Sequence, residues 1–185
     1  MATISSRGAP DALLDTYEAE RRPVVKEVIS IAKDLGRIIC ERDPALAEER
    51  NRRMHAEMAT GKGTAVRQDL FPPIAAGPLC RPSPGAAGPA GRPAPQPSVR
   101  TGDGRTALLD DVTGDGFRLL ARPGFHLGPD AERAALALGI GFCTIAADPQ
   151  EAGGDGHLVE ADGVFRDWMA KYGHAAVLVR PDHMI

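Results

Sequence analysis

Aromatic residues and cysteines are scarce in this chain of 185 residues. Phe, Trp and Tyr make up 4% of the sequence, so a core built from its 43% hydrophobic residues would be mainly aliphatic. The three cysteines, Cys40, Cys80 and Cys143, are odd in number and far apart, and they form neither a CxxC pair nor a disulfide framework. Because this usage is typical of a reducing compartment, we expect a cytoplasmic protein.

An excess of positive charge and a long apolar run are also missing. The 22 Lys and Arg residues are outnumbered by 25 Asp and Glu residues, which gives a formal net charge of −3. A general nucleic-acid-binding protein would need a basic excess to displace counterions from phosphates. No apolar run approaches the roughly 20 residues that span a bilayer. The sequence therefore predicts neither a nucleic-acid partner nor a membrane partner.

A block rich in proline and glycine divides the chain. Seven prolines and four glycines fall between Gly77 and Pro97, too many for a helix or a central strand. We interpret residues 77–97 as a linker between a helical segment (residues 1–76) and a small α/β domain (residues 98–185). A proline-rich ligand for a recognition domain is the alternative, although scattered glycines interrupt a polyproline helix.

The segment before this block has the pattern of helices. Asp11 can cap a run from Ala12 to Arg22, and Pro23 either breaks that run or begins a second helix at its first position. The apolar residues that follow repeat at helical spacing and predict one apolar stripe: Val25, Val28, Ile29, Ala32, Leu35 and Ile39.

A further helix is predicted beyond the stripe. Asp43 and Pro44 are a cap and a first residue, and the charged run from Ala45 to Thr60 continues to Gly61, which can end it.

Beyond the block the pattern changes to alternating strands and helices. Short apolar runs predict buried strands, and the segments between them have helical spacing. The expected strands are Phe117–Pro123, Gly141–Ala147 and Ala175–Arg180, and the expected helices are Asp130–Gly139 and Val164–Tyr172. This order implies an α/β layer structure.

Motifs that carry chemistry are not complete anywhere in the sequence. A phosphate loop around Lys62 lacks the required first glycine and the Ser or Thr after the lysine, and no GxGxxG follows a strand. The histidines show no ligand pairing, and Cys143, inside an apolar run, is interpreted as a buried hydrophobic residue and not as a nucleophile. We therefore predict no catalytic residue and no metal site in this chain.

Several segments resemble one family in the correct order. The segment LLDTYEAERRP (Leu13–Pro23) is similar to a stretch of class A flavoprotein aromatic monooxygenases. The residues that follow resemble the branch that includes 3-(3-hydroxyphenyl)propionate hydroxylase. The matching segments are Val24–Asn51, AGRPAPQPSV (Ala90–Val99), TALLDD (Thr106–Asp111), GFRLLARPG (Gly116–Gly124), Asp167-Trp168 and VLVRPDHM (Val177–Met184).

The resemblance implies an FAD-dependent, NAD(P)H-using enzyme that hydroxylates phenolic rings. It also implies that the C-terminal domain has a thioredoxin-like fold without the redox cysteine pair. The glycine-rich FAD loop is not in this sequence, so the FAD-binding residues stay unknown and we expect the chain alone to bind no cofactor. The charged residues of the first motif, Glu18, Glu20, Arg21 and Arg22, are expected to hold their helix in place or to meet the flavin domain.

Three hypotheses follow. The chain is a fragment or a split gene product of such a hydroxylase and is inactive alone, or it supplies a lid or substrate-side wall to a separately encoded flavin-binding subunit. Alternatively it is a non-catalytic thioredoxin-like interaction or dimerisation module that associates through the helix Val25–Ile39. The sequence does not identify the aromatic substrate.

Overall fold

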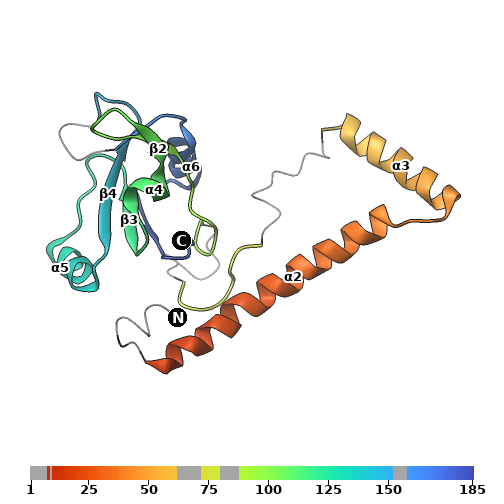
Figure 1. The fold of residues 1–185 in the computed structure, drawn as a ribbon, viewed down its shortest axis with the longest axis horizontal. Coiled ribbons are helices and arrows are strands. Elements are labelled where there is room, and N and C mark those ends of the chain that lie inside the picture. Colours follow the sequence, from red (N-terminus) through yellow and green to blue (C-terminus); the bar gives the residue numbers. More distant parts are fainter. Residues whose placement is uncertain (1–7, 9, 62–71, 80–87, 152–157) are drawn as a thin grey trace. The chain divides into compact units, whose positions relative to one another are not determined.

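The computed structural model describes residues 8, 10–61, 72–79, 88–151 and 158–185. The chain divides into two compact units, residues 1–79 and 80–185 (unit 1 and unit 2, Figure 1). Cys80, His157 and residues 80–87 of the predicted linker lie outside the described residues.

Unit 1 is helical. A short 3₁₀ helix, η1 (Asp11–Leu14), leads into α2 (Asp15–Ile39), and α3 (Pro44–Ala59) follows. The predicted cap of α3 is confirmed, because the Asp43 carboxylate accepts hydrogen bonds from the backbone N–H groups of Ala45 (2.8 Å) and Leu46 (3.3 Å). These bonds satisfy two of the donors that the first turn of a helix leaves free.

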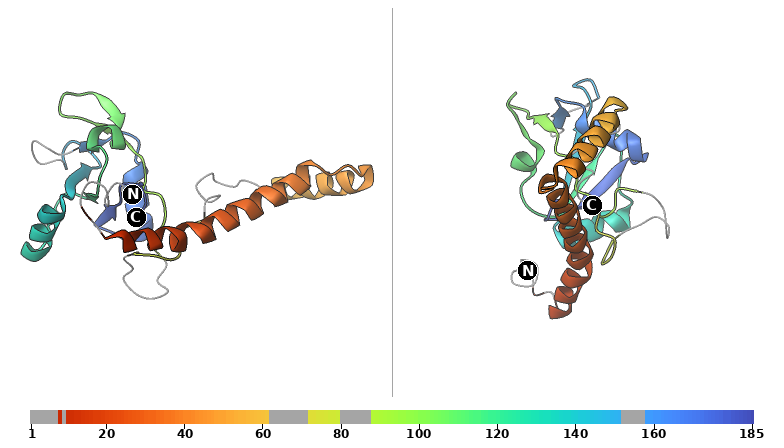
Figure 2. Two further views of the ribbon diagram at one scale, coloured as in Figure 1. Left: turned by 60° about the horizontal axis from the view of Figure 1, so that its bottom comes forward. Right: turned by 90° about the vertical axis from the view of Figure 1, so that its right-hand side faces the viewer.

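Two predictions about the start of the helical segment are wrong. Asp11 lies inside η1 and caps nothing, because the residue at the cap position is Pro10 and no side chain caps the turn. Pro23 lies inside α2, which neither stops nor restarts there (Figure 2). The ring fixes φ near the helical value, so proline costs the helix one hydrogen bond but does not forbid the conformation.

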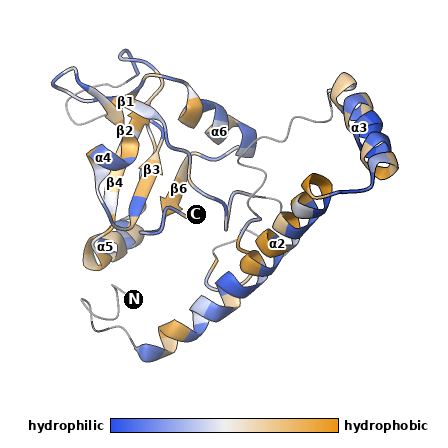
Figure 3. Cartoon of the chain, turned by 45° about the vertical axis from the view of Figure 1, so that its right-hand side comes forward, coloured by the Kyte–Doolittle hydropathy of each residue, from blue (hydrophilic) through white to orange (hydrophobic). Residues whose placement is uncertain are grey.

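The predicted apolar stripe lies along α2, and we call it the α2 stripe; it is exposed within unit 1. Val25 is 46% exposed, Ile29 54% and Ile39 76%, and the helix carries apolar patches along its length, whereas α3 is mainly polar (Figure 3). The predicted helical stripe is therefore present, and the described part of unit 1 does not cover it.

Unit 2 is built on one mixed sheet of six short strands. They are β1 (Ser98–Arg100), β2 (Thr106–Leu108), β3 (Arg118–Ala121), β4 (Gly141–Ala146), β5 (Leu158–Glu160) and β6 (Ala176–Val179). Their order in the sheet is β2-β1-β5-β4-β3-β6. Strand β3 is parallel to β4 and antiparallel to β6, and β4 is parallel to β5.

Three helices accompany this sheet: α4 (Leu109–Thr113), α5 (Pro129–Leu138) and α6 (Val164–Tyr172). The core joins α4 and α6 to the strands, through Leu109, Phe165 and Met169 on the helices and Leu120 and Ile145 on β3 and β4. The predicted α/β class, with a helical segment ahead of it, is confirmed.

The first described segment of unit 2 lies beside its last. Residues 91–94 and 183–185 exchange three backbone hydrogen bonds, and Pro93 forms an isolated bridge with Met184. Pro97 is fully buried, so the last residues of the segment interpreted as a linker, 91–97, are packed within unit 2.

Candidate functional site

Four of the motifs that carry the resemblance meet at one buried arginine in unit 2. Arg118 on β3 is 3% exposed. Its Nη1 donates to Asp110 Oδ1 (2.6 Å) and to Thr113 Oγ1 (2.9 Å), both on α4. A buried guanidinium needs such partners because an unpaired buried charge costs several kcal/mol.

Two further side chains contact the carboxylate of Asp110. Gln96 Nε2 donates to Asp110 Oδ2 (2.7 Å), and His183 Nδ1 lies 3.0 Å from that oxygen and 3.1 Å from Arg118 Nη2. Since a neutral imidazole nitrogen either donates or accepts, Nδ1 bonds to Asp110 as a donor or to Arg118 as an acceptor. Together these residues form the Arg118 cluster: Gln96, Asp110, Thr113, Arg118 and His183.

The Arg118 cluster pairs charges from different segments of unit 2. Among the buried side-chain polar atoms of the described residues, Arg118 Nε is without a hydrogen-bond partner. Within that same part of the chain, no three His, Cys, Asp or Glu side chains gather as metal ligands would. The arrangement can fix segments of chain in place, because residues from four segments share its hydrogen bonds.

A separate close contact lies in unit 1, between the part of α2 within the motif Leu13–Pro23 and the segment 72–79. Glu20 on α2 is 4% exposed, and Ile74 is also buried. Gly77 has φ +92°, and a Cβ built on it would lie 2.4 Å from Glu20 Cγ. Only glycine fits here, because the backbone conformation and the lack of space both exclude a side chain.

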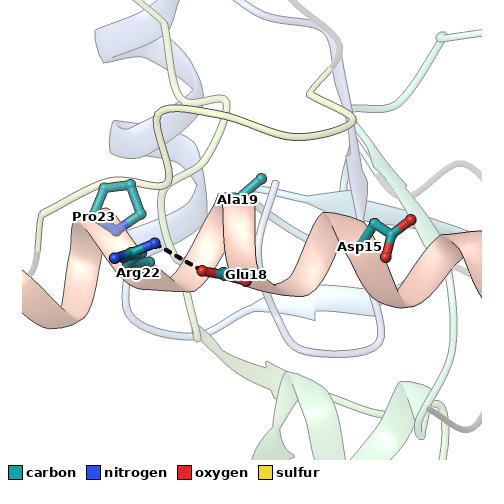
Figure 4. A pocket seen from close by; sticks show the side chains of 5 residues that line it. All are labelled: Asp15, Glu18, Ala19, Arg22 and Pro23. Atoms are coloured by element: carbon teal, nitrogen blue, oxygen red, sulfur yellow. Dashed lines mark hydrogen bonds and ion pairs between the residues drawn. The ribbon is translucent and has the colours of Figure 1, made fainter.

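The other charged residues of the first motif are on the surface. Glu18 and Arg22 form the predicted i,i+4 ion pair at 2.9 Å, and both are largely exposed, so the pair contributes little to stability. Asp15, Glu18, Ala19, Arg22 and Pro23 line an open pocket on α2 (Figure 4). Arg21 is exposed. Of the four charged residues, Glu20 is thus the one that holds neighbouring chain.

Two carboxylates at the end of β5 fix the start of α6. Glu160 accepts from the backbone N–H groups of Phe165 and Arg166 (3.0 Å for the latter), in place of a cap that Gly163 cannot supply. Burial raises the pKa of Glu160, and these hydrogen bonds offset only part of that rise. Burial would also raise the Asp162 pKa, but hydrogen bonds from the backbone of Ser98 and Val164 bring it below its usual value.

Glu160→Gln should alter how stability depends on pH. Because the pKa of Glu160 is raised on folding, the folded wild type binds a proton that the unfolded chain lacks as pH falls from neutrality toward 4.5, the ordinary value. The free energy of unfolding of the wild type should therefore rise relative to that of Glu160→Gln over this range. Urea unfolding of both proteins at several pH values measures the difference, and a constant or opposite difference contradicts the assignment.

Cys143 should react slowly with thiol reagents. It lies half-buried on β4, and burial raises the pKa of its thiol to about 11. Cys40 is exposed at the end of α2. At pH 8 a Cys40→Ala/Cys80→Ala variant should be modified at least about tenfold more slowly than a Cys80→Ala/Cys143→Ala variant, because burial disfavours the Cys143 thiolate and limits access to it. Equal rates with a disulfide reagent would show that Cys143 is accessible and ionised.

The sequence motifs and the fold together define the C-terminal part of flavoprotein aromatic hydroxylases, as the resemblance implied. A family model described as the HcaD C-terminal domain matches residues 91–185, and the chain belongs to that family.

Longer curated proteins match nearly the whole chain. A probable NADH-specific resorcinol 4-hydroxylase of Rhodococcus jostii (strain RHA1) is 32% identical over 95% of this chain and 31% of its own length. A 3-(3-hydroxy-phenyl)propionate/3-hydroxycinnamic acid hydroxylase of Mycobacterium sp. (strain KMS) is 30% identical over 100% of this chain and 35% of its own. The chain thus spans about a third of the length of these relatives.

Solved structures share the fold. Aklavinone-11 hydroxylase, in a ternary complex with FAD and aklavinone, is 24% identical with a TM-score of 0.55, over 99% of this chain and 32% of its own. The rebeccamycin biosynthetic enzyme RebC with reduced flavin is 25% identical with a TM-score of 0.55, over 98% and 34%.

Sequence reasoning missed the Arg118 cluster, although each of Gln96, Asp110, Arg118 and His183 lies in a motif that carried the resemblance. The available signal was the presence of charged residues inside otherwise apolar motifs. Among the described residues, His55, His126 and His174 belong to no group of possible metal ligands.

No helix of the described chain is long and apolar enough to cross a bilayer.

Proposed function

We propose that this chain serves as the C-terminal part of an FAD-dependent, NAD(P)H-using monooxygenase that hydroxylates phenolic compounds, and that it is inactive alone. The observation that carries this proposal is the match of 95–100% of the chain to about a third of proteins named as aromatic hydroxylases. Among the relatives, one is named for resorcinol and NADH and another for 3-(3-hydroxy-phenyl)propionate. A phenol with a second ring substituent is accordingly the proposed substrate class.

The partner in this proposal is a flavin-binding unit that covers the α2 stripe. The stripe is apolar and exposed at Val25, Ile29 and Ile39, and burying such side chains contributes roughly 25 cal/mol per Å². In this scheme residues 1–76 complete the flavin-binding part, residues 77–97 connect, and residues 98–185 form the thioredoxin-like domain. Cytoplasmic location is part of the same proposal, because NADH is supplied there.

Reconstitution tests the proposal. The purified chain should show no flavin absorbance near 450 nm and no hydroxylation of resorcinol or 3-(3-hydroxyphenyl)propionate. Mixed with the flavin-binding portion of a relative, it should bind that portion and raise NADH-dependent hydroxylation. Flavin bound by the chain alone, or a mixture that neither binds nor gains activity, contradicts the proposal.

A matched pair of variants locates the contact. Ile29→Asp places a charge in the α2 stripe and should weaken the complex at least tenfold, because a carboxylate would be desolvated at the interface. Ser30→Asp adds the same charge on the neighbouring exposed position outside the stripe and should leave binding within about twofold. Equal effects of the two substitutions would remove the stripe from the interface.

The exposed α2 stripe also favours a second function, that of a non-catalytic interaction or dimerisation module. In that case the chain should dimerise at micromolar concentration without any flavoprotein, and Ile29→Asp should return it to a monomer. Analytical ultracentrifugation across a concentration series distinguishes this outcome from the first proposal, in which the chain stays monomeric until the flavin-binding unit is added.

A further inference from the structure

The contact between the first and last described segments of unit 2 is short. Gly91 N donates to Ile185 O (2.6 Å), Ile185 N to Arg92 O (3.0 Å) and Ala94 N to His183 O (2.8 Å). Two isolated strands of this length are at best marginally stable in water. Ala94 and Ile185 also pack against the core of unit 2, and Pro97 is buried. Beyond these contacts, a side chain from each segment reaches the Arg118 cluster.

The Arg118 cluster supplies a side chain from each segment to one acceptor. Gln96, from the first segment, and His183, from the last, both contact Asp110 Oδ2, at 2.7 and 3.0 Å. The other oxygen of Asp110 is held by Arg118 at 2.6 Å, and the guanidinium is itself buried on β3. The two segments therefore converge on a carboxylate that the sheet core fixes in place.

The backbone of His183 is under strain that this contact offsets. Its φ is +62°, a left-handed conformation that is unfavourable for a residue with a side chain. His183 N donates to Arg180 O (2.9 Å), and Arg180 N donates to Met184 O (2.8 Å), which closes the turn. The imidazole of His183 reaches the Arg118 cluster from this turn.

We propose that the Arg118 cluster is a clasp that makes residues 91–97 and 180–185 open and close as one cooperative unit, separately from the sheet core. The clasp is independent of hydroxylase activity, since every contact in it lies within unit 2. It acts by linking Gln96 and His183 through Asp110, so that release of either side chain weakens the hold on both segments.

Amide hydrogen exchange of the full chain, followed by NMR, tests the clasp with two substitutions. His183→Gly removes the imidazole but relieves the strain of the left-handed backbone. Amide exchange at Gly91, Ala94 and Ile185 should nevertheless accelerate about tenfold, which is the factor expected for the loss of one net hydrogen bond. Gln96→Ala should accelerate exchange at Ile185 severalfold, although its bond is to Asp110 and not to the C-terminal segment. The Leu120 amide in β3 should keep its rate in both.

A control and three contrary outcomes complete the test. Asp103→Ala removes a carboxylate that bonds Thr101 and Arg105 in the exposed β1–β2 turn, and it should change none of these amides. Unchanged or slower exchange in His183→Gly would show that backbone conformation alone holds the segment. The clasp is equally excluded if Gln96→Ala leaves amide exchange at Ile185 unchanged. It is also excluded if exchange at Leu120 accelerates as much as exchange at Ile185, because the segments then open only together with the whole unit.

Discussion

Asp110→Ala is expected to lower the free energy of unfolding of unit 2 by about 3 kcal/mol, the range for breaking one side of a buried ion pair. The side chain of Arg118 is 4% exposed and that of Asp110 30%, so the substitution leaves a buried guanidinium with Thr113 as its remaining partner on α4. Urea unfolding measured by fluorescence of Trp168, the one tryptophan of the chain, reports on unit 2 directly.

A double variant tests whether Asp110→Ala destabilises unit 2 by leaving a charge unpaired or by removing packing. Arg118→Met in the Asp110→Ala background removes the uncompensated charge, so the double variant should be more stable than Asp110→Ala alone. Asp111→Ala, at the exposed neighbouring position, should change stability by less than about 0.5 kcal/mol. If the double variant is less stable than Asp110→Ala, the ion pair is not the origin of the effect.

Gly77→Ala should release the segment 72–79 from α2. The new Cβ would lie 2.4 Å from Glu20 Cγ and 2.7 Å from its Oε1, on a backbone with φ +92°. The left-handed conformation alone costs about 1–2 kcal/mol, and the overlap adds to it. Limited proteolysis should therefore cleave near the buried Ile74 at least 30-fold faster than in the wild type.

The chain contains a glycine that serves as the opposite control. Gly36 lies inside α2 with open space around its Cβ position, so Gly36→Ala should stabilise the helix by about 1 kcal/mol. Glu20→Ala in the Gly77→Ala background removes the atoms that overlap and should restore part of the protection at Ile74. Equal rates of cleavage in wild type and Gly77→Ala would mean that the segment is not held at Glu20.

The longer elements were predictable because their apolar spacing is sustained. Val164–Tyr172 is helical over the predicted residues, and α5 differs from its prediction by one residue at each end. Strands β1, β2 and β5 have three residues each, too few for alternation to emerge from the surrounding sequence. β1 and β2 pair as a local hairpin, but β5 pairs with a strand distant in the chain, as Val99 with Glu160 shows.

The burial of the charged residues could not be predicted from the sequence, for a different reason. Glu20 and Arg118 are usually surface residue types, and nothing in their local spacing says that Gly77 or Asp110 will lie beside them. By contrast the Glu18–Arg22 pair depends only on helical geometry, and it was predicted. Contacts within one helix can be inferred from spacing, whereas contacts between segments require the tertiary fold.

Pro23 interrupts the hydrogen bonding of α2 at one point. It has no N–H to donate to the carbonyl of Ala19, one turn earlier, so the ladder of helical hydrogen bonds is interrupted there. The turns before the interruption are anchored by Glu20 beneath Gly77, while those after it carry the exposed stripe. The hydrogen-bond ladder of α2 is therefore weakest between the turns anchored at Glu20 and the turns that carry the exposed stripe.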